Sequence, residues 1–225
     1  MARKKIGLIT YQKPHRKTDE VMQRLLYCDY ELTICTLPYI SRPHREVFFA
    51  HRPNQFVAAA QRDIAKKHGI EYHEYERDID ICTDSEIYLV LGANILSKEC
   101  VDRLRIINCH PGVIPASRGL DSFKWALYTM KPLGVTLHYL DADVDSGEII
   151  SVIPTDVYQS DSLESLSRRH YQNEIDALVR FEEYSVKPIN IFSAISPDRA
   201  RMRMPLSQEQ ELPEAFAEYK RKYAI

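Results

Sequence analysis

The sequence predicts an α/β fold: a Rossmann-like, open, mostly parallel sheet with helices on both faces and a small C-terminal appendage. Three observations predict it. Short apolar runs of strand length alternate with stretches of helical periodicity in the first half of the chain. Four of the seven glycines lie between residues 108 and 150, where a predicted strand runs into sharp turns. Beyond residue 186, prolines interrupt the chain before a final charged stretch.

The first elements alternate as this fold requires. Lys5 to Thr10 is a short apolar run that suits a buried strand, Asp19 to Leu26 a helix, and Glu31 to Leu37 a second strand. Residues 38–53 hold three prolines among basic side chains, so we expect an irregular, partly exposed segment. Helical spacing resumes from Phe56 to His68, followed by glycine in the C-terminal position that favours it.

The central elements lead to the glycine-rich stretch. A strongly apolar strand, EIYLVLG, begins at Glu86, a short helix follows from Ser97 to Leu104, and Arg105 to Asn108 forms the next strand. Strand, helix and strand in repetition predict parallel pairing, because a crossover helix returns the chain to the same end of the sheet.

The second half changes pattern. Val135 to Leu140 and Ile149 to Val157 are typical of neighbouring strands. Asp161 then opens a long helix to about Tyr184, and its spacing from Glu164 resembles a capping box. Glu209 to Tyr223 is expected to be a final charged helix. We therefore predict a main domain over 1–186 and an extension over 187–225 that could form a dimer contact.

Composition narrows the classes of partner. The 30 basic and 32 acidic residues give a net charge of −2, which excludes the broad cationic field that holds nucleic acid or an anionic membrane. Small-molecule partners are therefore expected. Five cysteines, an odd number without a CxxC pair, predict reduced thiols in a cytoplasmic protein. No apolar stretch reaches the roughly 18 residues of a membrane span.

A polar pair closes the strand before the glycine-rich stretch. Asn108 and His110 are two residues apart, so in a strand their side chains point to one side and Cys109 to the other. An amide and a protonated imidazole held there could both donate to one oxygen, as a developing oxyanion requires. Asp145, from a later loop, could face His110, favour its charged form and relay a proton. The set suits acyl transfer.

Each part also has a structural interpretation. An Asn-x-His at a strand end can serve as a cap or turn, and the Asp-Ser-Gly at Asp145 is ordinary turn chemistry. His138, within an alternating strand, fits a hydrogen-bonded structural histidine. Two histidines and a carboxylate could face a metal, but their spacing matches no zinc or iron motif, so we expect no metal. The strand alternation disfavours Cys109 as a nucleophile.

Taken together, N-x-H-P-G-x-x-P-x-x-R-G from Asn108 and G-V-T-x-H-x-x-x-x-x-x-D-x-G-x-I-I from Gly134 resemble the signature of the folate-dependent formyltransferases. The stretch LVLGANIL, ending at Leu96, resembles that family's folate-pocket strand and loop. The resemblance implies transfer of a formyl group from N10-formyltetrahydrofolate to a primary amine, without a metal. It also implies that Asn108 and His110 stabilise the oxyanion while Asp145 supports the histidine and the proton transfers.

The resemblance further implies a catalytic domain over 1–186 and two sets of binding residues. The folate would be held, mainly through backbone groups, by Gly92, Ala93, Asn94, Ile95, Leu96, Ala142, Asp143 and Val144. We expect the acceptor to contact a glutamine and several basic residues: Gln12, Lys13, Arg45, His51, Arg52 and Arg118. The basic segment, with aromatic residues nearby, could supply charge and a stacking surface, or it could be a solvated loop.

Features that the sequence lacks narrow the choice of the amine that accepts the formyl group. Purine-pathway members place a glycine-rich turn for a ribose phosphate after the first strand, whereas TYQKPHRKTDE has no glycine. Methionyl-tRNA members carry a basic C-terminal domain, and the residues after Ile150 have no net positive charge. By elimination we expect a nucleotide-linked amino sugar for surface polysaccharide such as lipopolysaccharide. The alternatives are formyltetrahydrofolate hydrolysis, whose enzymes usually carry a further N-terminal domain, and formylation of glycinamide ribonucleotide.

Overall fold

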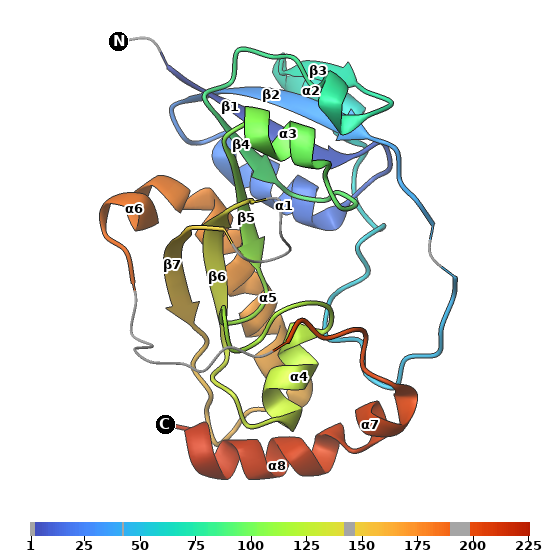
Figure 1. Cartoon of the computed structure of the whole chain (residues 1–225), viewed down its shortest axis with the longest axis vertical. Helices are drawn as coiled ribbons and strands as arrows, with labels where there is room; N and C mark the ends of the chain where they lie inside the picture. The colour runs from blue at the N-terminus through green and yellow to red at the C-terminus, as the bar shows by residue number, and fades with distance from the viewer. Residues whose placement is uncertain (1–2, 42, 142–146, 190–198) are drawn as a thin grey trace. The chain divides into compact units, whose positions relative to one another are not determined.

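Seven strands form one sheet in the order β3-β2-β1-β4-β5-β6-β7 (Figure 1). This computed structural model describes residues 3–41, 43–141, 147–189 and 199–225. The pairs β1–β2, β1–β4, β2–β3 and β4–β5 are parallel, and β6–β7 is antiparallel. The predicted mostly parallel α/β fold is therefore confirmed.

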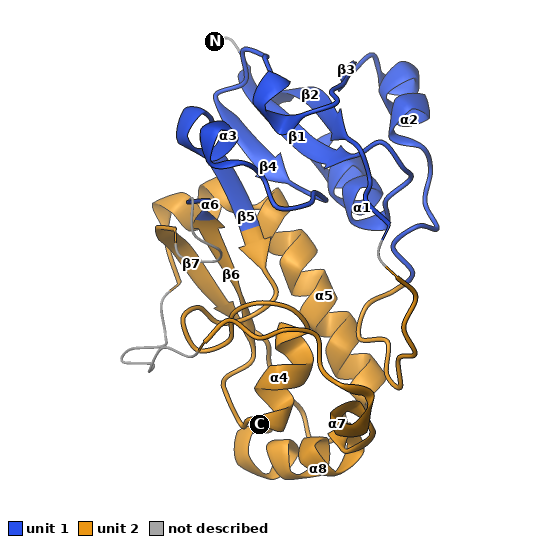
Figure 2. Ribbon diagram, turned by 45° about the vertical axis from the view of Figure 1, so that its right-hand side comes forward, with its two compact units in different colours: residues 1–42, 54–108, 139–143 blue, residues 43–53, 109–138, 144–225 orange. Residues whose placement is uncertain are grey.

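The chain divides into two compact units (Figure 2). Unit 1 comprises residues 1–42, 54–108 and 139–143, and unit 2 comprises residues 43–53, 109–138 and 144–225. The boundary expected between residues 186 and 187 stays a prediction.

Unit 1 contains the parallel part of the sheet and its crossover helices. Its elements are β1 (Lys4–Tyr11), α1 (Arg16–Leu25), β2 (Tyr30–Leu37), α2 (Gln61–His68), β3 (Glu71–Glu74), η1 (Asp78–Asp80), β4 (Ile87–Val90), α3 (Lys98–Arg103) and the start of β5 (Ile106–His110). From β1 the chain crosses to β2 on one side, and from β4 it crosses to β5 on the other. Right-handed crossovers in opposite directions place α1 and α3 on opposite faces of these strands, as Figure 1 shows.

The inner strands of unit 1, β1, β2 and β4, form where the sequence is apolar enough to be buried on both faces. Ile6 lies between Leu32 of β2 and Ile87 of β4 in the register of the sheet. Beneath α3, a core cluster continues this packing with Ile9, Cys35, Leu37, Ile81, Tyr88, Cys100 and Ile106. All five cysteines of the chain are free thiols, and burial raises the pKa of Cys35 to about 12.

The predicted helix over Phe56 to His68 is wrong in its first turn. α2 begins at Gln61, and the backbone N–H of Phe56 instead donates to the side chain of Asn54 at 3.0 Å. This local bond favours a turn over a helix, as short polar side chains often do. The end of α2 is as predicted, because Gly69 adopts the left-handed conformation with φ of +65°.

Unit 2 combines the antiparallel strand pair with most of the longer helices. Its elements are α4 (Ser122–Tyr128), β6 (Gly134–Tyr139), β7 (Ile149–Pro154), α5 (Leu163–Val179), α6 (Phe181–Val186), α7 (Leu206–Gln210) and α8 (Leu212–Tyr223). Its core cluster includes Phe123 and Trp125 from α4, Leu166 from α5, and Phe216 and Tyr219 from α8. The C-terminal extension is therefore packed into this unit's core through α8.

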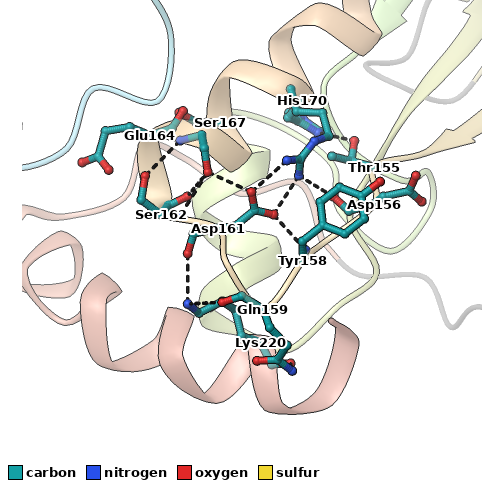
Figure 3. A network of polar contacts seen from close by, with 12 residues as sticks. Thr155, Asp156, Tyr158, Gln159, Asp161, Ser162, Glu164, Ser167, His170 and Lys220 are labelled. Carbon is teal, nitrogen blue, oxygen red and sulfur yellow. Dashed lines mark hydrogen bonds and ion pairs between the residues drawn. The ribbon is translucent and has the colours of Figure 1, made fainter. Parts of the chain in front are cut away.

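The start of α5 is capped differently from the prediction (Figure 3). Ser162 is the N-cap, and it forms a capping box with Ser165, so Asp161 and Glu164 do not form that box. Asp161 is buried and accepts two bonds from the guanidinium of Arg169, at 2.7 and 2.8 Å. The Lys220 ammonium of α8 donates to the carbonyl of Asp161 at 2.9 Å, so this polar network ties α8 to the start of α5.

Two predicted single helices are each divided. The helix expected to run to Tyr184 breaks at Arg180 between α5 and α6. The last helix breaks at Glu211, because Pro213 lies in the first turn of α8 and cannot continue the hydrogen bonds of α7. Among the described residues, no helix is long and apolar enough to span a membrane.

Candidate active site

Three parts of unit 1 lie at one edge of its sheet. β1, β4 and β5 run parallel, so their carboxyl ends lie together, and open α/β sheets bind ligands at such an edge. Residues 12–15 follow β1, residues 91–97 follow β4, and Asn108 lies near the end of β5. The predicted contacts Gln12 and Lys13, the first predicted folate loop and the predicted catalytic amide thus share one edge.

His110 is the last residue of β5 and lies in unit 2. It follows Asn108 by two residues in one strand, so both side chains leave the same face of the strand. Asn108 is half-buried and His110 is buried, while Cys109 on the opposite face is 1% exposed. The strand geometry therefore keeps the thiol out of the amide and imidazole pair, as the alternation predicts.

The His110 ring is held by hydrogen bonds to the turn that follows it. Its Nε2 lies 2.8 Å from the carbonyl oxygen of Ser117 and 3.1 Å from the hydroxyl of Ser122. The Ser122 hydroxyl in turn donates to the carbonyl of Gly119 at 2.8 Å. A carbonyl oxygen only accepts, so Nε2 carries a proton and donates it.

Close approach of the backbone at Gly112 makes these hydrogen bonds possible. A Cβ on Gly112 would lie 2.9 Å from His110 Nε2, 2.8 Å from the Ser122 side chain, and in collision with the Ser117 carbonyl. The turn is also braced from β6, because the Thr136 hydroxyl donates to the Gly112 carbonyl at 2.7 Å and accepts from the Ile114 N–H at 3.0 Å. There is therefore no room for a side chain at position 112, and glycine is required there.

A second histidine packs beside this turn. His170 of α5 contacts the carbonyl of Pro111 through Nε2 at 3.2 Å and the hydroxyl of Thr155 through Nδ1 at 2.9 Å. Burial lowers the pKa of His170 to about 4, so the ring is neutral near pH 7. Nε2 faces a carbonyl and carries the proton, and Nδ1 accepts from Thr155. This neutral histidine supports the chain between His110 and Gly112.

The predicted folate loop after β4 combines a fixed backbone with an exposed apolar side chain. The Tyr11 hydroxyl donates to the carbonyl of Ala93 at 2.8 Å, and the Asn94 amide donates to the carbonyl of Pro38 at 3.1 Å. Gly92 lies against Tyr11, where a Cβ would come within 2.8 Å of the ring. Ile95 is 85% exposed. Rigid backbone groups next to an apolar side chain suit a flat heterocycle such as a pterin.

The turn after β1 carries a cation among aromatic rings. The Lys13 ammonium lies 4.3 Å from the centre of the Phe56 ring and 4.9 Å from that of Tyr39. Tyr11 contacts Tyr39 edge-to-face at 5.1 Å. Gln12 is exposed, and its side-chain amide donates to the carbonyl of Tyr75 at 3.1 Å. This part of unit 1 offers charge and stacking surface together.

The other predicted acceptor contacts lie in unit 2 and make internal contacts there. Arg45 donates to the Met204 carbonyl at 2.6 Å and pairs with Glu209, while Arg52 pairs with Glu174. His51 stacks on the Phe123 ring with centres 5.7 Å apart. The backbone carbonyl of Arg118 accepts from the N–H of Arg201 at 3.0 Å. These bonds give each residue a part in the fold of unit 2, and their predicted contact with an acceptor stays a prediction.

Four predicted site residues lie outside the described residues: Asp145, Ala142, Asp143 and Val144. Their predicted roles stay predictions. Within the described ranges, the structure shows no group of three histidine, cysteine, aspartate or glutamate side chains placed to hold a metal.

Sequence reasoning missed the groups that hold the histidine. These are the Ser117 carbonyl, the Ser122 hydroxyl and the supporting ring of His170. A signal for the first two was present, because Gly112 and Gly119 enclose the turn. Nothing in the local pattern marks His170, which comes from a helix far along the chain.

The open, mostly parallel sheet, with crossover helices on both faces of its first strands, defines this chain as an α/β protein of the doubly wound class. Within that class, residues 47–181, more than half of the chain, match the formyl transferase family. The chain therefore belongs to that family.

Individual relatives agree with this assignment. The phosphoribosylglycinamide formyltransferase of Bacillus subtilis is 35% identical over 71 residues, which cover 31% of this chain and 36% of that protein. The enzyme of that name from Mycobacterium tuberculosis strain H37Rv is 33% identical over 91 residues, covering 40% of this chain and 41% of its own length. The matches thus span roughly two fifths or less of these relatives.

Solved structures share the fold over a larger part of the chain. A 4-N formyltransferase from Francisella tularensis superposes with a TM-score of 0.57 at 16% identity, covering 88% of this chain and 75% of that one. A phosphoribosylglycinamide formyltransferase from Anaplasma phagocytophilum gives a TM-score of 0.54 at 22% identity, covering 78% and 83%. At these identities the likeness shows the fold.

Proposed function

We propose that this protein transfers a formyl group from N10-formyltetrahydrofolate to the primary amine of a nucleotide-linked amino sugar. One observation carries the reaction type. In a member of the formyl transferase family, Asn108 and a proton-bearing His110 leave the same face of β5 at the carboxyl edge of the sheet. An amide donor and an imidazole side by side suit stabilisation of an acyl oxyanion.

The reaction needs three kinds of help from the chain. Asn108 would donate its amide N–H to the formyl oxygen as negative charge develops there. His110 would accept a proton from the amine nitrogen once it has bonded to the formyl carbon, or donate one when charged. Asp145 would favour the charged imidazole and pass a proton toward the leaving nitrogen N10. No step in this scheme calls for a metal.

The loop after β4 would receive the formyl donor. Its backbone is fixed by the bonds from Tyr11 and Asn94, and Ile95 offers apolar surface. Binding through backbone groups would tolerate changes at side chains that do not fix the loop, because backbone donors and acceptors do not depend on them.

The turn after β1 supports a nucleotide-linked acceptor over a ribose phosphate. A phosphate cradle needs unengaged N–H groups at a helix start. Here the first N–H of α1, from Arg16, donates to the carbonyl of Gln55 at 2.7 Å. The Lys13 ammonium beside the rings of Tyr39 and Phe56 instead suits a diphosphate with a flat base.

Glycinamide ribonucleotide is the second candidate acceptor. It is favoured by the phosphoribosylglycinamide formyltransferases compared above, whose aligned segments reach 35% identity. Hydrolysis, with water in place of the amine, is the third possibility, since the same donor groups would serve it.

One assay separates the three. The purified protein is mixed with N10-formyltetrahydrofolate, and tetrahydrofolate release is followed without amine, with glycinamide ribonucleotide, and with nucleotide-linked 3- and 4-amino sugars of several bases. We expect release to depend on an amino sugar, with a formamide in the product by mass spectrometry. Equal release without any amine would identify a hydrolase, and release with glycinamide ribonucleotide alone would overturn the sugar assignment.

A further inference from the structure

The turn that forms hydrogen bonds with His110 is itself held by a distant part of the chain. Residues 199–205, here called the C-terminal strap, run beside the turn in unit 2 and precede α7. Arg201 forms a parallel bridge with Gly119, in which the Leu120 N–H donates to the Arg201 carbonyl at 2.8 Å. Arg201 lies roughly eighty residues beyond Gly119 in the sequence. A distant stretch of the chain thus adds a strand-like edge to the turn.

Two further hydrogen bonds and one cation–π contact fasten the strap. The Met204 N–H donates to the buried Asp121 carboxylate at 3.0 Å, and the Trp125 indole N–H donates to the carbonyl of Met202 at 2.8 Å. The Arg201 guanidinium also lies 4.7 Å from the centre of the Trp125 ring. Asp121 directly precedes Ser122, so the strap is fixed next to the residues that contact His110.

The hydrogen bonds to His110 Nε2 decide which imidazole nitrogen can exchange a proton. The Ser117 carbonyl accepts from Nε2, and the hydroxyl proton of Ser122 is directed to Gly119, which leaves its lone pairs facing Nε2. Both partners therefore require a proton on Nε2 in the neutral and the charged ring. The nitrogen that gains or loses a proton is then Nδ1.

We propose that the C-terminal strap is a positioning element for His110: by holding the turn from Gly112 to Ser122, it keeps the proton on Nε2 and assigns proton exchange to Nδ1. Ser122 is a positioning residue in this scheme. The inference rests on the proposed function for its kinetic consequence, but the tautomer itself can be observed without turnover.

Gly119 offers a selective way to displace the strap. Its φ is +88°, and an added Cβ would collide with the Arg201 backbone. Gly69 at the end of α2 provides a matched control, because its φ is +65° and an added Cβ would meet nothing within 4 Å. Both Gly→Ala changes carry the cost of left-handed backbone, and only Gly119→Ala pushes on the strap.

The test uses the full chain labelled with 15N-histidine, with the His110 signals assigned by their loss in His110→Gln. In the wild type we expect an N–H-type Nε2 at every pH and an Nδ1 that alone titrates. In Gly119→Ala we expect a second population with the proton on Nδ1 and a kcat lower by about tenfold or more, with both KM values unchanged. Gly69→Ala should keep the wild-type spectrum and kcat.

Trp125→Phe, which removes the bond to Met202, serves as the second strap variant if Gly119→Ala does not fold. An unprotonated Nε2 in the wild type would overturn the proposal, as would a Gly119→Ala or Trp125→Phe spectrum and kcat equal to those of Gly69→Ala. A wild-type protein with the expected tautomer and no formyl transfer to any amine would support the positioning of His110 and sink the proposed function alone.

Discussion

The ammonium of Lys124 lies 2.8 Å from a carboxylate oxygen of Glu209, and the two side chains are 1% and 0% exposed. Glu209 also pairs with Arg45 and accepts from the backbone N–H groups of Phe48 and Phe49. One buried carboxylate of α7 thus joins α4 to the segment over residues 43–53. This explains how a basic, proline-containing segment is ordered by the C-terminal extension.

The first prediction concerns the asymmetry of this pair. Glu209→Leu leaves the Lys124 charge buried without its partner and should lower the free energy of unfolding by about 3–5 kcal/mol. Lys124→Met should cost less, because Glu209 keeps Arg45 and the two backbone donors. Urea denaturation of both variants measures the difference.

The exposed Glu218 of α8 supplies the control, since Glu218→Leu should change stability by less than about 0.5 kcal/mol. Equal losses for Glu209→Leu and Lys124→Met would show that the other donors to Glu209 contribute nothing.

The second prediction concerns stability in mild acid. The pKa of His170 is about 4 in the folded chain and near 6.5 when solvated, so the unfolded chain binds more protons between these values. The free energy of unfolding should therefore be fully retained above pH 6.5 and fall as the pH drops toward 4, by on the order of 3 kcal/mol from this group. Denaturation midpoints measured across this range give the slope.

His170→Gln should reduce that slope, and the part contributed by His51 should remain. Burial and the nearby charges of Arg52 and Lys124 also lower the pKa of His51, so it contributes in the same direction. A slope unchanged in His170→Gln would contradict a neutral, buried His170.

The third prediction concerns a separate window at lower pH. The Arg169 guanidinium lowers the pKa of Asp161 from 3.8 to about 2. The stability from this pair should be present above about pH 4 and lost as the pH falls toward 2, amounting to roughly 2 kcal/mol. Arg169→Gln should remove this loss without altering the slope between pH 6.5 and 4, which separates the two groups in one titration of stability.

Periodicity predicted most strands and failed where burial is uniform. Nothing in the pattern marks α4, because every residue from Ser122 to Leu127 is buried and no polar face reveals the helical repeat. β3 was missed for the opposite reason: Glu71 to Glu74 is a short edge strand with charged and half-buried residues. In both cases position in the fold, rather than local preference, decides the element.

The candidate site divides in the same way. Asn108 and His110 could be predicted because their chemistry resides in side chains at the end of an apolar strand. The partner of His110 is a backbone carbonyl at Ser117, and any residue type could supply that oxygen. Its strap comes from residues 199–205, a contact that depends on tertiary structure and leaves no spacing to detect.

The fourth prediction tests the proposed oxyanion donors. Asn108→Ala should lower kcat by about 10²- to 10³-fold, because one donor to the developing charge is removed. KM should change little if the amide acts mainly in the transition state. Asn94→Ala, in the loop after β4, is the comparison, and we expect it to act on the KM of the folate. A fully active Asn108→Ala variant would remove Asn108 from the site.

The last prediction concerns the acceptor. Lys13→Gln should raise KM for a nucleotide-linked amino sugar by about tenfold, the loss expected when one charge-assisted contact worth about 1.4 kcal/mol is removed. Because Lys13 lies over Phe56, Phe56→Leu should raise the same KM through lost stacking, and the two effects should be less than additive. KM for the folate should not change, and Lys66→Gln, at an exposed lysine of α2, should change neither KM.

If Lys13→Gln also shifts the folate KM, the Lys13 ammonium contacts the formyl donor instead, since formyltetrahydrofolate carries carboxylates of its own. Initial rates over a grid of the two substrates distinguish these outcomes, because each substrate's KM is then obtained at saturation of the other.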